Sequence, residues 1–332
     1  MITYPKYKVA SAQIAPVWLN LDASVDKAID FIQEAARNGA KLIAFPEGYL
    51  PGYPWWILFG DPIAYGLKFW NELYRNAVEI PSKTISRLSN AAKENDIYIC
   101  MSVTEKDGAS LYLSQLWFNK KGDLINKHRK VRPTITERTI WGEGDGSMMK
   151  VVDTELGRLG GLHCWEHKMV GNLWAMASQN EQVHVAAWPA GNGIPDSLFC
   201  NENMEVDSKY YAATNGTFVL ASTHVIDQYL IDRLGGNIPQ PLGMGHAMII
   251  NPHGFIISET LPHDQEGNVY ADIDLNMIID CKYFIDPAGH YSKPGVSRML
   301  FNKNPLKAVT DVGTPEDTFI SAEELANVTL EK

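Results

Sequence analysis

Apolar residues recur at two spacings along the first half of the chain, and each spacing predicts a type of element. Residues three or four positions apart indicate one face of an amphipathic helix that ends near Asn38-Gly39. The continuous apolar run over 42–45 instead predicts a short buried strand, which Pro46 ends. A second helical pattern precedes a strand over 97–103. The residues of the two helical faces are Val25, Ala28, Ile29, Ile32, Ala35 and Ala36, and then Ile85, Leu88, Ala91 and Ala92.

The middle of the chain adds a hairpin and further buried strands. Segments 112–118 and 124–130 flank a turn that contains Gly122, which is typical of a β-hairpin. Apolar runs over 159–163, 183–188 and 217–222 predict strands, with a helix near 173–178. The last part has antiparallel character, with strands expected over 247–250, 255–258 and 269–275. Strands that alternate with helices predict a layered α/β protein, in which catalytic groups usually lie just past strand ends.

Composition narrows the class of protein. The chain has 332 residues and a formal net charge of -10. It carries no basic run, so we expect no nucleic-acid partner, because phosphate neutralisation needs clustered Lys and Arg. No apolar run approaches the roughly 18 residues that suggest a membrane span, and the first residues lack an apolar signal core. We therefore expect a cytoplasmic protein without a membrane partner, whose four cysteines are free thiols.

Three residues of reactive types stand at the ends of three predicted strands. Glu47 follows the strand ending at 45, Lys130 ends the second strand of the hairpin, and Cys164 ends the strand over 159–163. Each alone has a structural explanation, because a cysteine after an apolar strand is usually a buried small hydrophobe. A glutamate there is usually a cap or a solvated residue, and a lysine an exposed charge. Their shared placement nevertheless predicts that the three side chains converge on one pocket.

The residues around these three positions resemble a known family. Phe45-Pro46-Glu47, the segment 128–134 (HRKVRPT) and the segment 161–167 (GLHCWEH) resemble the three motif blocks of the nitrilase superfamily, most closely its nitrilase branch. The similarity runs from about Lys8 to Asn304. Further matching blocks are Thr136-Glu137-Arg138, residues 141–147 (WGEGDGS), residues 181–186 (EQVHVA) and residues 286–291 (DPAGHY).

The resemblance implies roles, a fold and an assembly. Glu47 matches the general base of the family, Lys130 its catalytic lysine, Cys164 its nucleophile and Glu137 the second glutamate that orients the reacting groups. The family fold is a four-layer α-β-β-α sandwich, here expected over 1–304, followed by a C-terminal tail over 305–332 that contacts other subunits. Members of this branch form dimers that extend into spiral homo-oligomers. Their substrate is a nitrile, which is hydrolysed to the acid and ammonia through a thioimidate and a thioester, without a cofactor.

Four further residues are predicted to contact the substrate. In related nitrilases the region of Tyr53 lies near the active site, and Trp165 and Trp188 follow strands, where they can wall an apolar pocket. His163 departs from the family, which usually carries a smaller or uncharged residue before the cysteine. A metal site built from Cys164, His163, His167 and His184 is an alternative interpretation. We expect no metal, because adjacent residues of a strand point to opposite faces.

Other functions remain open from the sequence. A cyanide dihydratase uses the same residues, and the segments 116–119, 127–130, 147–149 and 280–291 resemble that group. Arg132-Pro133-Thr134 instead resembles the nitrilases of organic nitriles, which we favour. An amidase or carbamoylase would use the same nucleophile, but Cys164-Trp165-Glu166 favours the nitrilase branch. A catalytically silent binding protein would lack one of the four catalytic residues, and all four are present.

Overall fold

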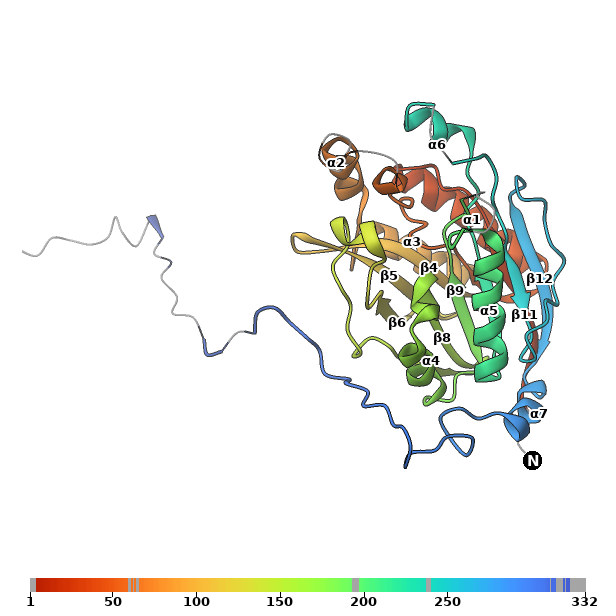
Figure 1. Cartoon of the computed structure of the whole chain (residues 1–332). Coiled ribbons are helices and arrows are strands. Elements are labelled where there is room, and N and C mark those ends of the chain that lie inside the picture. The colour runs from red at the N-terminus through yellow and green to blue at the C-terminus, as the bar shows by residue number, and fades with distance from the viewer. Residues whose placement is uncertain are drawn as a thin grey trace, which may run out of the picture.

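Two β-sheets pack face to face, and each is covered on its outer side by helices (Figure 1). The computed structural model describes residues 4–58, 61, 63, 66–192, 197–236, 240–310, 312–314, 319 and 321–322. In this part of the chain the strand order is β12-β1-β2-β4-β5-β6 in one sheet, where β3 also pairs with β4. The order in the other sheet is β11-β10-β9-β8-β7.

The first sheet is formed by strands from both ends of the chain. Its strands are β1 (Lys6–Gln13), β2 (Ala40–Ala44), β3 (Val78–Glu79), β4 (Tyr98–Asp107), β5 (Ser110–Phe118), β6 (Leu124–Arg129) and β12 (Gly267–Asp274). Its outer face is covered by α1 (Leu21–Arg37) and α3 (Lys83–Glu94). Asn20 and Ser82 cap these helices, because their side chains accept hydrogen bonds from first-turn backbone N–H groups.

The second sheet carries the other helical layer. Its strands are β7 (Val152–Thr154), β8 (Gly157–His163), β9 (Val183–Ala187), β10 (Phe218–Ser222) and β11 (Met248–Ile250). Strands β8, β9 and β10 are parallel. Helices α4 (Val170–Ala177) and α5 (Asn201–Asn215) cover the outer face (Figure 1).

Three hydrophobic clusters confirm the predicted four layers. One joins α1 and α3 to the first sheet, and another joins α4 and α5 to the second. The third fills the space between the sheets, with side chains such as Leu42 and Trp117 meeting Val185 and Leu220. Residues of one strand point alternately to the two faces of its sheet. Helices cover one face of each sheet and the other sheet covers the second face, so the strands are nearly continuous apolar runs.

Most predicted elements are confirmed to within a few residues, and one is wrong. The segment 255–258 is not a strand, since only an isolated bridge joins Ile250 to Ile256. The sequence patterns missed the 15-residue helix α5 and several short helices. The short helices are η1 (Trp55–Leu58), α2 (Gly66–Asn76), η2 (Ile135–Thr139), η3 (Cys164–Lys168), α6 (Gln228–Arg233) and α7 (Met277–Phe284). Within the described ranges, no helix combines the length and apolar character needed to cross a membrane.

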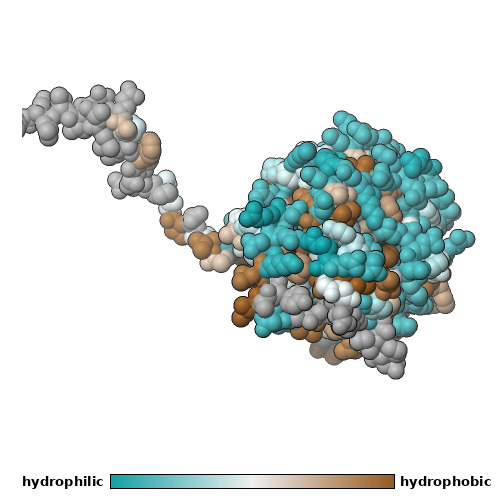
Figure 2. Space-filling view, turned by 90° about the horizontal axis from the view of Figure 1, so that it is seen from above, coloured by the Kyte–Doolittle hydropathy of each residue, from teal (hydrophilic) through white to brown (hydrophobic). Residues whose placement is uncertain are grey.

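The segment that follows α7 first packs on the helical layer of the second sheet, through Met299 and Phe301. The backbone N–H of Leu306 donates to Asp145 at 2.7 Å. The chain then extends away from the body of the molecule (Figure 1). Leu300, between Met299 and Phe301, and Val309, farther along, are exposed. Hydrophobic residues are visible along the segment that leaves the body (Figure 2). Much of the predicted tail over 305–332 lies outside the described residues.

Candidate active site

A buried lysine lies between two buried carboxylates at the ends of the strands. Lys130 directly follows β6, and its Nζ donates to Glu47 Oε1 at 2.8 Å and to Glu137 Oε2 at 2.7 Å. The side chains of Lys130 and Glu47 are fully buried, and that of Glu137 is 3% exposed. An ammonium group has three N–H donors, so two are used by these carboxylates and one remains for a reacting group.

Glu137 is oriented by its position in a short helix. It is the third residue of η2, so its carboxylate reaches back to the backbone N–H of Thr134 at 2.7 Å. The hydroxyl of Tyr53 donates to the other oxygen at 2.8 Å. Together with Lys130, these contacts hold the Glu137 side chain in one orientation.

The backbone around Glu47 is held from three directions. The N–H of Glu47 donates to Trp188 O at 3.2 Å, and the ring of His224 donates through Nε2 to Glu47 O at 2.7 Å. The N–H of the next residue, Gly48, donates to Ser102 Oγ at 2.7 Å. Glu47 Oε2 is buried and has no hydrogen-bond partner among the described residues. This oxygen is therefore free to accept a proton from a substrate, a water molecule or a nearby thiol.

Cys164 lies at the sharp turn between β8 and η3. Its φ is 42°, in the left-handed region that costs a residue with a Cβ about 1–3 kcal/mol and that is common at functional sites. The backbone N–H of Trp165 donates to the sulfur. Burial, and then the charge of Glu47, raises the pKa of the Cys164 thiol well above its usual range. The resting group is therefore a thiol, and it needs a base before it can attack.

The same burial prepares Glu47 to be that base. Removal from water raises the pKa of Glu47 to about 8, against the opposing charge of Lys130. Burial opposes the charge on Lys130, but the charges of Glu137 and Glu47 outweigh it and raise the pKa of Lys130. A carboxylate with a pKa near the working pH is an effective general base, and a lysine that stays charged stabilises developing negative charge.

Cys164 and Glu137 line a cavity of about 370 Å³. Its size lies within the range of small-molecule sites, and most of its lining is apolar. The lining residues are Tyr53, Trp55, Ile57, Leu58, Thr134, Ile135, Thr136, Glu137, Cys164, Pro189, Ala190, Asn192, Phe199 and Gln240.

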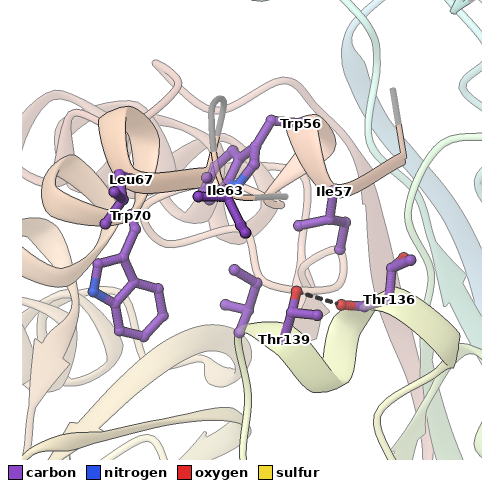
Figure 3. A pocket seen from close by; sticks show the side chains of 9 residues that line it. Trp56, Ile57, Ile63, Leu67, Trp70, Thr136 and Thr139 are labelled. Carbon is purple, nitrogen blue, oxygen red and sulfur yellow. Dashed lines mark hydrogen bonds between the residues drawn. The ribbon is translucent and has the colours of Figure 1, made fainter. Parts of the chain in front are cut away.

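A second apolar pocket of about 380 Å³ adjoins this cavity. Ile57 and Thr136 line both. Figure 3 shows the side chains of Leu67 and Trp70, from α2, on the opposite side of this pocket from η2, where Thr139 Oγ1 donates to Thr136 O at 2.7 Å. The apolar surface therefore continues beyond the immediate surroundings of Cys164.

The structure places the four predicted contact residues differently. Tyr53 lines the cavity. Trp165 stacks on Phe199, with ring centroids 4.7 Å apart, so it supports the cavity wall from behind. Trp188 is buried outside the cavity, where its Nε1 donates to Ser208 Oγ at 3.1 Å. His163, the last residue of β8, does not line the cavity, and its ring lies 2.8 Å from Ser102 Oγ.

Sequence patterns missed several residues that shape the site. Phe199, Ala190 and Gln240 line the cavity, and His224 holds the Glu47 carbonyl. None of them lies in a motif that carries chemistry by itself. A cavity wall assembled from distant loops leaves no periodic signal in the sequence.

Two groups of histidines lie near Cys164 and bear on metal binding. Among the described residues, His128, His163 and Glu166 place potential ligand atoms within 4.8 Å of one another. The Glu166 carboxylate already accepts hydrogen bonds from the backbone N–H groups of Val131 and His163, both at 2.8 Å, and from His128. Both oxygens of the Glu166 carboxylate are therefore occupied, whereas His128 Nδ1 and His163 Nδ1 are buried without a hydrogen-bond partner among the described residues. His167 and His184 bond to each other rather than to Cys164 Sγ.

Comparisons with known proteins agree with this geometry. The family described as carbon-nitrogen hydrolase matches residues 8–283. The chain is 50% identical to a nitrilase of Bacillus sp. (strain OxB-1), over 98% of this chain and 96% of that protein. It is 43% identical to an aliphatic nitrilase of Rhodococcus rhodochrous, over 93% of this chain and 83% of that protein. Among solved structures, Saccharomyces cerevisiae Nit3, of branch 10 of the nitrilase superfamily, matches with a TM-score of 0.69 and 20% identity, covering 88% of this chain and 98% of that one.

Proposed function

This chain belongs to the carbon-nitrogen hydrolase family, and we propose that it is a nitrilase that converts an organic nitrile to a carboxylic acid and ammonia. The observation that carries the proposal is that Cys164 and Glu137 line one apolar cavity, while Lys130 joins Glu137 to Glu47 and the charges of all three act on Cys164. Similarity to nitrilases over nearly the whole chain supports the choice of reaction.

In the proposed reaction Glu137 holds Lys130 in place, and the other three residues act on the substrate. Glu47 removes the thiol proton of Cys164, and the sulfur attacks the nitrile carbon to form a thioimidate. The nitrogen gains a proton and is stabilised by the free N–H of Lys130 and by the backbone N–H of Trp165. Glu47 then activates water, which adds to the thioimidate carbon. Loss of ammonia leaves a thioester, and a second water molecule releases the acid and restores the thiol.

The size and lining of the cavity favour an organic nitrile over hydrogen cyanide. One water molecule occupies roughly 30 Å³ in the liquid, and hydrogen cyanide is also a small molecule of only three atoms. The cavity of about 370 Å³ is far larger than either. Aromatic and aliphatic walls stabilise an apolar group beside the nitrile through burial. Cyanide has no such group.

Ammonia release from a panel of nitriles, cyanide and amides tests the proposal. We expect turnover of arylaliphatic or longer aliphatic nitriles, and weak turnover of cyanide. The Cys164→Ala variant is expected to retain the circular dichroism spectrum of the wild type and to lose turnover. Turnover by that variant, or hydrolysis of amides alone, would refute the assignment.

We also propose that the protein self-associates into dimers and spiral homo-oligomers and works in the cytoplasm. The exposed hydrophobic side chains on the segment after α7 support association, because large apolar surfaces are usually covered. The four free cysteines suit a reducing compartment. Light scattering of the full chain and of a variant ending at residue 304 measures the contribution of the tail, which we expect to lengthen the oligomer.

A further inference from the structure

A chain of buried hydrogen bonds leads from the backbone of Cys164 into the second sheet. His167 Nδ1 lies 2.5 Å from Cys164 O, and His167 Nε2 lies 2.9 Å from His184 Nε2. His184 Nδ1 lies 2.8 Å from Glu181 Oε1, and the hydroxyl of Tyr211 donates to Glu181 Oε2 at 2.5 Å. None of these four side chains lines the cavity, and the proposed reaction does not use them.

The members of this chain are tightly enclosed. Their exposed fractions are 2% or less. The ring of His184 stacks on Tyr211 with centroids 3.9 Å apart, and that of His167 stacks on Trp188 at 5.1 Å. Gly160 of β8 leaves room for the carboxylate, since a Cβ there would lie 2.2 Å from Glu181 Oε1. A polar chain of this kind is stable only if every bond has a hydrogen and an acceptor.

Counting hydrogens assigns the donors. The carbonyl of Cys164 only accepts, so His167 donates through Nδ1 and must accept at Nε2 when neutral. Burial, followed by the charge of His184, lowers the pKa of His167 to about 3, which keeps that ring neutral. His184 therefore donates through Nε2 to His167, and one proton joins His184 Nδ1 to Glu181 Oε1. Every bond of the chain then has one hydrogen and one acceptor.

The bond from His167 reaches the reacting sulfur through one peptide group. The carbonyl of Cys164 and the N–H of Trp165 belong to the same amide, and that N–H donates to Cys164 Sγ. A hydrogen bond to the oxygen of an amide polarises it and strengthens the donor on its nitrogen. The same bond also fixes the peptide at the turn where Cys164 has a φ of 42°.

We propose that Glu181, His184 and His167 are positioning residues, which polarise and hold the Cys164–Trp165 peptide so that its N–H stabilises the thiolate and the developing negative charge. The proposal rests on Cys164 being the nucleophile of the proposed function. The charges of Glu47, Lys130 and Glu137 act on the sulfur directly, whereas this chain reaches it through the Cys164–Trp165 peptide. The effect of the buried hydrogen-bond chain can therefore be measured separately from the effects of these three residues.

The rate at which iodoacetamide alkylates Cys164, measured against pH in the full-length protein by peptide mass spectrometry, tests this inference without nitrile turnover. His167→Ala removes the donor to the carbonyl, and Glu181→Gln keeps the volume but replaces the carboxyl group that bonds to His184 by an amide. We expect Cys164 to be alkylated about fivefold more slowly in both variants, because that is the factor that the loss of one net hydrogen bond gives. The pH midpoint of alkylation should also be higher. His167→Asn restores a donor near the Nδ1 position and is expected to recover most of the rate.

Two controls keep the result interpretable. Ser11→Ala changes a buried hydroxyl of β1 that has no partner among the described residues, and it should alkylate like the wild type. The proposed role of the buried hydrogen-bond chain would be overturned if the pH midpoint of alkylation were unchanged in both His167→Ala and Glu181→Gln. It would also be overturned if Cys164 were alkylated no faster in His167→Asn than in His167→Ala. If the wild-type protein were alkylated at Cys164 but released no ammonia from any nitrile, the proposed function would be refuted. The alkylation rates of the variants would still test the buried hydrogen-bond chain.

Discussion

The raised pKa of Glu47 makes the pH dependence of activity a direct test of the proposed base. Glu47 must be ionised to accept the thiol proton, and burial raises its pKa to about 8. The pKa of Cys164 is raised well above its usual range, so the thiol stays protonated in this interval. The ionised fraction of Glu47 is then about one tenth at pH 7 and about nine tenths at pH 9, because each pH unit from the pKa changes the ratio tenfold.

Activity should therefore rise with pH rather than fall. Steady-state kcat/KM for one nitrile, measured by ammonia release from pH 5.5 to 9.5, is expected to increase about tenfold between pH 7 and 9 with a midpoint near 8. Activity assayed at pH 8 after incubation at each pH serves as the control for unfolding. Glu47→Gln should lose about 10²–10⁴-fold and flatten the profile. A wild-type rate that is constant from pH 6 to 9 would show that Lys130 already keeps Glu47 ionised, and the reasoning would fail.

Three other variants test single contacts. His224→Leu leaves the backbone carbonyl of Glu47 without its hydrogen-bond donor and should lower kcat about tenfold with little change in KM, whereas His224→Gln keeps a donor and should retain activity. Gly161→Ala would place its Cβ 2.4 Å from Gln115 Oε1 and should lower the unfolding temperature by several degrees, whereas Gly171→Ala, with ordinary contacts, should not. Phe199→Ala removes an aromatic wall and should raise KM about tenfold for an arylaliphatic nitrile but not for acetonitrile. An unchanged ratio of the two KM values would exclude Phe199 from the substrate contact.

Local pattern was enough to predict a layered α/β protein, and the resemblance to the nitrilase superfamily added the four-layer arrangement. The helical face that includes Val25 and Ile32 and the apolar run that includes Leu42 and Ile43 both fold as their spacing indicates. The error at 255–258 has a physical cause, since a short apolar segment becomes a strand only where a neighbour offers a complete ladder of hydrogen bonds. Short helices such as η2 lack the length for a periodic signal.

Local sequence is sufficient to show that Glu47, Lys130 and Cys164 follow predicted strands, and parallel and antiparallel neighbours bring these residues together. Their environment, in contrast, depends on the tertiary structure. The pKa of Glu47, the position of His163 outside the cavity and the chain from His167 to Glu181 depend on burial and on contacts between distant segments. Electrostatic and hydrogen-bond energies vary with distance and solvent exposure, and neither quantity is contained in the order of residues.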